Sequence, residues 1–104
     1  MVLYVMKWQI HPDKVQDYSE WQAGAIRRTL SVPGVVEFRG YRPLSGASQV
    51  VVTYEFADLG TWAAWRSDDS LKDVLQELYT LALNVTGEIW GPSANVPEPI
   101  RPGG

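Results

Sequence analysis

The sequence predicts an α+β protein built on one four-stranded antiparallel sheet, with its helices packed on a single face. Stretches of alternating apolar residues occur at the start, in the middle and near the end of the chain, and segments with helical periodicity separate them. The length of 104 residues is that of one ordinary domain. With 45% apolar and 20% charged residues, the composition is that of a globular protein with a single core.

The first predicted strand, residues 2–10, carries apolar side chains on both faces. Successive strand residues point to opposite sides of a sheet. One face would hold Val2, Tyr4, Met6, Trp8 and Ile10. The opposite face begins with Leu3 and Val5 and becomes polar only at Lys7 and Gln9.

A helix is expected directly after this strand, beginning near His11-Pro12-Asp13 and stopped by Pro33-Gly34. Proline is well tolerated at the first helical position, and an acidic residue in the first turn suits the helix dipole. A helical wheel places one set of residues on the buried side: Val15, Tyr18, Gln22, Ala25, Ile26, Thr29 and Leu30.

Two further strands are predicted over residues 35–44 and 49–56, joined in a hairpin by the small residues 45–48. Asp58 can cap a short helix that carries Trp62 and Trp65. Residues 67–70 offer caps for a second helix, whose buried stripe would be Leu71, Val74, Leu75, Leu78, Leu81 and Ala82.

Residues 84–90 leave room for a last strand, and the tail that follows holds four of the seven prolines. The order is therefore strand, helix, strand, strand, helix, strand, with the second helical region split. Two such units build the ferredoxin-like βαββαβ fold, with both helical regions on one face of the sheet. We expect one domain over residues 1–91 and a Pro/Gly-rich C-terminal tail over 92–104.

The face of the sheet away from the helices is expected to display Leu3, Val5, Val51 and Thr53 among charges of both signs. Leaving aliphatic side chains in water forgoes about 1.5–3 kcal/mol each. A second copy of the chain could bury them, so a homodimer through this face is predicted. The alternative is a monomer in which one face of the sheet is exposed to solvent, as is common for antiparallel sheets.

Charge and composition exclude several classes of function. The net charge is −3 and the nine Lys and Arg are scattered, so nucleic-acid binding is not expected. The absence of Cys, together with a single His, argues against a transition-metal site. With no basic leader before the first strand and no apolar run long enough for a bilayer, we expect a soluble, cytoplasmic protein that does not bind membranes.

Two stretches, SVPGVVEFRGYRP and VVVTYEFADLGTWAAWRSDDSLKDVLQEL, together with the order of elements, resemble the antibiotic biosynthesis monooxygenase family of dimeric α/β barrels. The resemblance covers roughly residues 2–91. It implies two ferredoxin-like subunits joined sheet to sheet, each with a pocket between its sheet and its helices. Members of the family include cofactor-independent monooxygenases acting on hydroquinone- or anthrone-like aromatics, and haem-degrading enzymes.

Both groups of enzymes are similar to this chain at Trp65, the tryptophan that closes the short helix. The haem-degrading group also needs a histidine that falls here on Leu75 and an asparagine that falls near Met6. Leucine cannot ligate iron, so haem degradation in the family's manner is not expected. The monooxygenases carry an asparagine one turn before the tryptophan, where this chain has Thr61.

Cofactor-free oxygenation needs a base, a hydrogen-bond donor and aromatic walls that exclude water. His11 is the candidate base because its ordinary pKa lies near neutrality, although a residue beside a helix start needs no catalytic role. Trp65 is the second catalytic candidate, with core packing as the simpler explanation. The candidate ligand-binding residues are Tyr4, Met6, Trp8, Tyr54, Trp62 and Leu75.

The leading hypothesis is therefore a homodimeric, cofactor-independent monooxygenase acting on a small aromatic or quinol-type substrate, with no cofactor and no metal. A non-catalytic ligand-binding or structural module of the same fold is the alternative, since a fold does not fix a function. An isomerase or cyclase that needs no oxygen is a third possibility.

Overall fold

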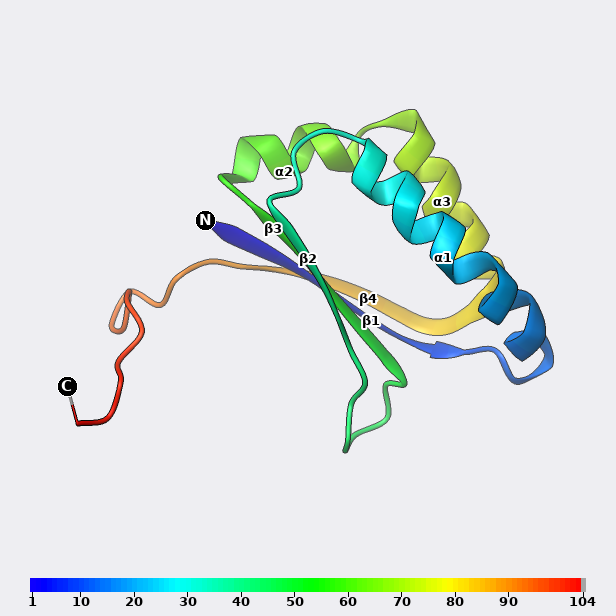
Figure 1. Cartoon of the computed structure of the whole chain (residues 1–104), viewed down its shortest axis with the longest axis horizontal. Helices are drawn as coiled ribbons and strands as arrows, with labels where there is room; N and C mark the ends of the chain where they lie inside the picture. The colour runs from blue at the N-terminus through cyan, green and yellow to red at the C-terminus, as the bar shows by residue number, and fades with distance from the viewer. Residues whose placement is uncertain (104) are drawn as a thin grey trace.

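A four-stranded antiparallel sheet carries all the helices on one face, as Figure 1 shows. The computed structural model describes residues 1–103. Its elements are β1 (Val2–Ile10), the 3-10 turn η1 (Pro12–Lys14), α1 (Val15–Ser31), β2 (Glu37–Tyr41), β3 (Val50–Phe56), α2 (Leu59–Arg66), α3 (Asp69–Leu81) and β4 (Ala82–Trp90). The strand order is β2-β3-β1-β4, which confirms the predicted ferredoxin-like arrangement.

The face of the sheet toward the helices carries the alternate strand residues that were predicted to point that way. In the pairing of β1 with β3, Tyr4 lies opposite Tyr54 and Met6 opposite Val52. These four side chains are at most 7% exposed and join the main hydrophobic core. The strand alternation therefore identified the buried face correctly.

Helix α1 follows β1 through a capped turn. His11 Nδ1 accepts a hydrogen bond of 3.1 Å from the backbone N–H of Asp13, and Pro12 follows the cap. Three residues predicted to be buried in α1 are exposed: Val15 at 56%, Leu30 at 43%, and Gln22. Val15 lies beside an open depression at the end of β1. Leu30 directly follows the buried Thr29, so a rotation of about 100° turns its side chain away from the sheet.

The predicted hairpin is present, but its first strand is shorter than expected. β2 ends at Tyr41, whereas the sequence suggested a strand over residues 35–44. Pro43 has no N–H to donate to a ladder, and Leu44 is 88% exposed. Gly46, in the loop, has a φ of 89°, which a glycine adopts without strain.

The two C-terminal helices begin as predicted. The Asp58 carboxylate accepts a 2.7 Å hydrogen bond from the N–H of Thr61, and the Asp68 carboxylate accepts one of 2.8 Å from the N–H of Ser70. All six residues of the predicted apolar stripe are buried, although the last of them, Ala82, already belongs to β4. This stripe packs α3 onto the sheet beside α1.

The outer face of the sheet is less exposed than the sequence suggested. Val5 is 3% exposed and Thr53 is 8% exposed in the single chain. The two residues are paired across β1 and β3, and the register places Arg39 and Glu88 on either side of them. Val5 and Thr53 lie on the face predicted for them, but they are already removed from water in the single chain, whereas the sequence analysis expected a second copy to bury the aliphatic residues of this face.

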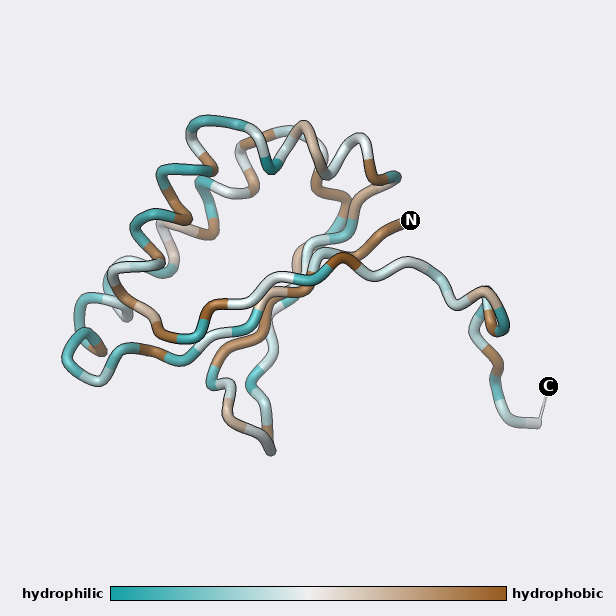
Figure 2. The backbone as a smooth tube through the Cα atoms, turned by 180° about the vertical axis from the view of Figure 1, so that it is seen from behind, coloured by the Kyte–Doolittle hydropathy of each residue, from teal (hydrophilic) through white to brown (hydrophobic). Residues whose placement is uncertain are grey.

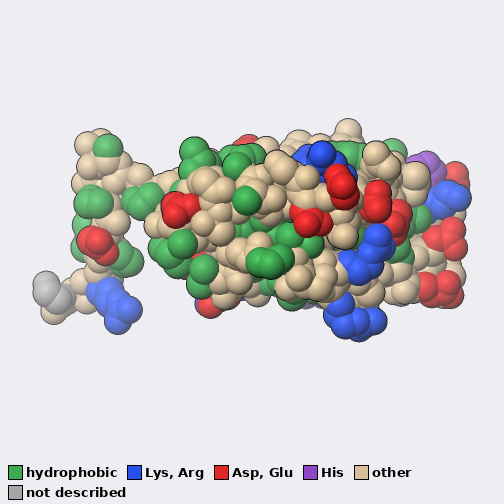
Figure 3. Space-filling view, turned by 90° about the horizontal axis from the view of Figure 1, so that it is seen from above, with side chains coloured by type: hydrophobic (Ala, Val, Ile, Leu, Met, Phe, Trp, Pro, Cys, Tyr) green, Lys and Arg blue, Asp and Glu red, His purple; other side chains and the backbone are tan. Residues whose placement is uncertain are grey.

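Beyond β4, residues 91–103 contain no helix or strand, and Figure 2 shows this segment running away from the sheet. The view in Figure 3 looks onto the helix side, where acidic and basic side chains gather on the solvent face. Within residues 1–103, none of the helices is both long and apolar enough to cross a membrane.

Candidate functional site

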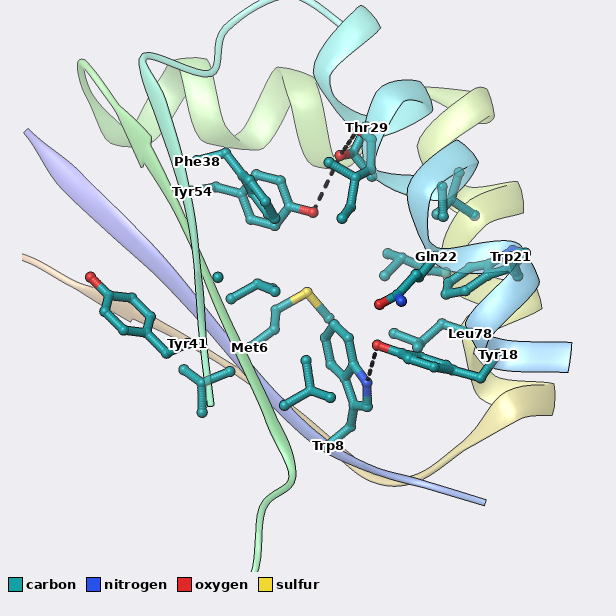
Figure 4. A pocket seen from close by; sticks show the side chains of 18 of the residues that line it. Met6, Trp8, Tyr18, Trp21, Gln22, Thr29, Phe38, Tyr41, Tyr54 and Leu78 are labelled. Carbon is teal, nitrogen blue, oxygen red and sulfur yellow. Dashed lines mark hydrogen bonds between the residues drawn. The ribbon is translucent and has the colours of Figure 1, made fainter. Parts of the chain in front are cut away.

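A cavity of about 330 Å³ lies between the inner face of the sheet and the helices α1 and α3 (Figure 4). Its walls are predominantly apolar and aromatic. The sheet contributes Met6, Trp8, Phe38, Val50, Val52 and Tyr54, and α3 contributes Leu71, Val74, Leu75 and Leu78. Helix α1 contributes the more polar wall, with Tyr18, Trp21, Gln22, Ala25, Ile26 and Thr29.

At one end of the cavity, two aromatic side chains form a buried hydrogen bond. Trp8 Nε1 donates to the hydroxyl oxygen of Tyr18 over 3.2 Å. Burial raises the pKa of the Tyr18 phenol, and the hydrogen bond from Trp8 partly opposes this shift. Tyr18 therefore stays protonated at neutral pH, with its oxygen already engaged as an acceptor.

At the other end, Tyr54 is fixed by a chain of hydroxyl hydrogen bonds. Its hydroxyl donates to Thr29 Oγ1 over 3.3 Å, and Thr29 Oγ1 donates to the carbonyl of Ile26 over 2.8 Å. Burial raises the pKa of Tyr54 to about 12, so this phenol is also neutral. Figure 4 shows the two tyrosines at opposite ends of the cavity.

Trp65 forms part of the wall and also completes the end of α1. It is 2% exposed, and its Nε1 donates over 3.0 Å to the carbonyl of Thr29. In a continuing helix this carbonyl would accept from the residue four positions later, which is Pro33 and has no N–H. The Trp65 indole supplies the missing donor, so its one polar atom is engaged within the protein.

The lining contains no Asp, Glu, His or Lys. Arg42 and Gln49, which are both exposed, contribute further polar side chains to the lining. Within the described residues 1–103, no group of three or more potential metal-ligating side chains of His, Cys, Asp or Glu comes together. The cavity can therefore hold a largely apolar ligand and hydrogen-bond to it, but it offers no carboxylate or imidazole as a base.

The structure brings five of the eight sequence-predicted site residues together in this lining: Met6, Trp8, Tyr54, Trp65 and Leu75. Tyr4 and Trp62 are outside it and pack against each other edge to face, with ring centroids 5.5 Å apart. His11 also lies outside the lining, at the cap of η1.

Sequence reasoning placed Tyr18, Gln22 and Thr29 on the buried side of the first helix but did not nominate them for the site. A signal was available, because three polar residues share an otherwise apolar stripe. Polar groups on a buried stripe need partners, either within the protein or from a ligand.

The sequence of this chain matches the model of one protein family. The sequence profile described as antibiotic biosynthesis monooxygenase matches residues 1–77, so the chain belongs to that family. Among proteins with curated descriptions, none matches this sequence.

Several solved structures share the fold. A DABB family protein with a ferredoxin-like fold from Mesorhizobium loti is 12% identical, with a TM-score of 0.79 over 89% of this chain and 97% of that one. SnoaB from Streptomyces nogalater, described as a cofactor-independent oxygenase, is 14% identical, with a TM-score of 0.73 over 93% and 97% of the two chains. A conserved protein from Methanosarcina mazei is 22% identical, with a TM-score of 0.72 over 86% and 89%. At these identities the likeness establishes the fold.

Proposed function

We propose that this chain is a cofactor-independent monooxygenase that binds a small aromatic or quinol-type substrate in the cavity between the sheet and the helices. The observation that carries the proposal is the cavity itself, with a volume of about 330 Å³, aromatic walls and only neutral polar groups at its two ends. Membership of the family, and the shared fold with an oxygenase described as cofactor-independent, support the same conclusion.

The reaction requires few groups from the protein. A phenol that has lost its proton is electron-rich enough to transfer an electron to molecular oxygen, and the two radicals combine at a ring carbon that is ortho or para to the phenolic oxygen and carries a hydrogen. The resulting peroxide loses water and leaves a quinone, so one oxygen atom enters the product and the other becomes water. The protein would hold the ring, exclude bulk water and stabilise the negative charge on the phenolic oxygen.

The test is oxygen consumption with a panel of hydroquinones and anthrone-like compounds, with product masses recorded in parallel. Val52→Phe places a larger side chain in the cavity wall, and we expect it to abolish uptake without unfolding the chain. Val36→Phe makes the same substitution at a site that is 57% exposed, and we expect it to retain uptake. Loss of uptake in both variants, or in neither, contradicts the proposal.

Absence of turnover on the whole panel, with aromatic ligands still bound, would favour a ligand-binding module of the same fold. Turnover under strict exclusion of oxygen would favour an isomerase or cyclase. Where product forms, its mass decides, because only monooxygenation adds one oxygen atom.

We further propose that two chains associate through the outer face of the sheet. Leu3 and Val51 are half-buried there, and the face carries Lys7 and Arg39 together with Glu55. Mixed charges of this kind can pair across a two-fold interface. Sedimentation at micromolar concentration should give about twice the chain mass of 11.7 kDa, and a species of 11.7 kDa contradicts the association.

A further inference from the structure

We propose that Tyr18 and Gln22 of α1 form a binding site for a phenolate oxygen, so that the cavity takes its substrate as the anion. This inference rests on the proposed function for the class of ligand, an aromatic phenol. It adds the residues that recognise the phenol oxygen and the protonation state that they select.

The hydroxyl proton of Tyr18 is available to a ligand. The Tyr18 oxygen accepts from Trp8 Nε1, and within residues 1–103 no acceptor takes the Tyr18 proton. Accepting one hydrogen bond polarises a hydroxyl and strengthens the bond that it donates. The ring is 5% exposed, so the donor acts where water competes weakly.

The other buried phenol, Tyr54, can offer a ligand only an acceptor and not a donor. Tyr54 already donates its proton to Thr29 Oγ1, so only its oxygen lone pairs are free to face a ligand. A negatively charged oxygen would be repelled there and attracted by Tyr18. The two ends of the cavity therefore differ, and an anionic oxygen belongs at the Trp8–Tyr18 end.

Gln22 supplies a second donor for the same oxygen. It follows Tyr18 by four residues on α1, which places both side chains on one face of the helix. Figure 4 shows its amide and the Tyr18 hydroxyl directed toward the same part of the cavity. Gln22 lines the cavity although the residue is exposed, and none of the side-chain hydrogen bonds of residues 1–103 engages its amide.

The charges of the cavity lining agree with an anionic ligand. Arg42, at the opening, is the one charged residue of the lining among residues 1–103. Behind Trp21, the Glu77 carboxylate accepts from both Arg28 and Trp21 Nε1, so its charge is compensated outside the lining. With no base in the lining to remove a proton, two donors would act by lowering the pKa of the bound phenol, and its proton would leave to solvent.

The experiment measures binding of p-nitrophenol under nitrogen, because its phenolate is seen directly by visible absorbance and no turnover is needed. For the wild type we expect the apparent pKa of the bound phenol to fall by about one unit, which corresponds to about tenfold tighter binding of the anion. In Tyr18→Phe we expect phenolate affinity to fall by about 10- to 100-fold, as for loss of a hydrogen bond to a charged group. Gln22→Leu should weaken it in the same direction.

Two controls separate recognition of charge from shape. Binding of p-nitroanisole, a neutral ether of the same shape, should change by less than about threefold in Tyr18→Phe, since no anion is lost. Tyr79→Phe removes the same atom from a tyrosine that is 56% exposed and outside the cavity lining, and it should preserve the fall in the ligand pKa.

The inference is overturned if the wild type fails to bind nitrophenolate at millimolar concentration. It is equally overturned if the pKa of the bound phenol does not fall, or if Tyr18→Phe weakens the ether and the phenolate alike. Oxygen consumption reports on the proposed function separately. A protein that lowers the ligand pKa but consumes no oxygen would retain this site and lose the monooxygenase assignment.

Discussion

Replacing Trp65 with phenylalanine tests whether this side chain holds the end of α1. The substitution removes the 3.0 Å hydrogen bond from Nε1 to the carbonyl of Thr29, and Pro33 cannot replace the donor. A buried carbonyl left without a partner costs about 1–3 kcal/mol. The smaller ring also leaves a void beside Tyr54 and Phe56, whose ring centroids lie 4.8 and 5.0 Å from that of Trp65, and this adds about 1–2 kcal/mol.

We therefore expect Trp65→Phe to lower the free energy of unfolding by about 2–5 kcal/mol, measured by urea denaturation followed by circular dichroism. The matched control is Trp90→Phe, because Trp90 is 47% exposed and its Nε1 donates to the exposed carboxylate of Glu88. That variant should change the free energy by less than about 0.5 kcal/mol. A loss below about 1 kcal/mol in Trp65→Phe refutes the argument that the indole completes the helix end.

Two further predictions concern stability. The hydrogen bond from Arg28 is the main cause that lowers the pKa of Glu77 to about 2, so this carboxylate stabilises the folded chain above its ordinary pKa and loses that contribution as the pH falls toward 2. The urea midpoint should therefore fall less between about pH 4.5 and 2 in Glu77→Gln than in the wild type, and equal slopes would contradict the pairing. Gly87→Ala would place a Cβ 2.7 Å from the Tyr4 hydroxyl, so its melting temperature should drop, corresponding to about 1–3 kcal/mol. Gly91→Ala, where a Cβ meets nothing within 4 Å, should melt as the wild type does, and equal melting of the two variants would contradict the close approach of Tyr4.

The sequence was most informative where one local rule decides the outcome. The stripe of α3 and the cap at Asp58 were predictable, because helical periodicity and a side chain that accepts from the first turn are both local features. Met6, Trp8 and Tyr54 were predictable as cavity residues because strand alternation puts them on the inner face, and Leu75 was predictable because it lies on the apolar stripe of α3.

The rest depends on contacts that the sequence does not display. The burial of Val5 could not be predicted, because its neighbours across the sheet, Thr53 and Glu88, are set by the strand register. The role of Trp65 follows from a carbonyl 36 residues earlier in the chain. Likewise, Tyr18 differs from the chemically identical Tyr54 only through its partners, because the Tyr18 oxygen accepts from Trp8 whereas the Tyr54 hydroxyl donates to Thr29.

The proposed function and the proposed phenolate site both require that the cavity binds a small aromatic molecule. Methyl NMR spectra recorded during a titration with p-nitrophenol test this directly. The methyl groups of Met6, Val52 and Leu75 should shift with one common saturation curve, while those of the exposed Val36 and Leu44 should not move. Shifts confined to the exposed methyl groups, with the cavity methyl groups unchanged at saturation, would contradict the account.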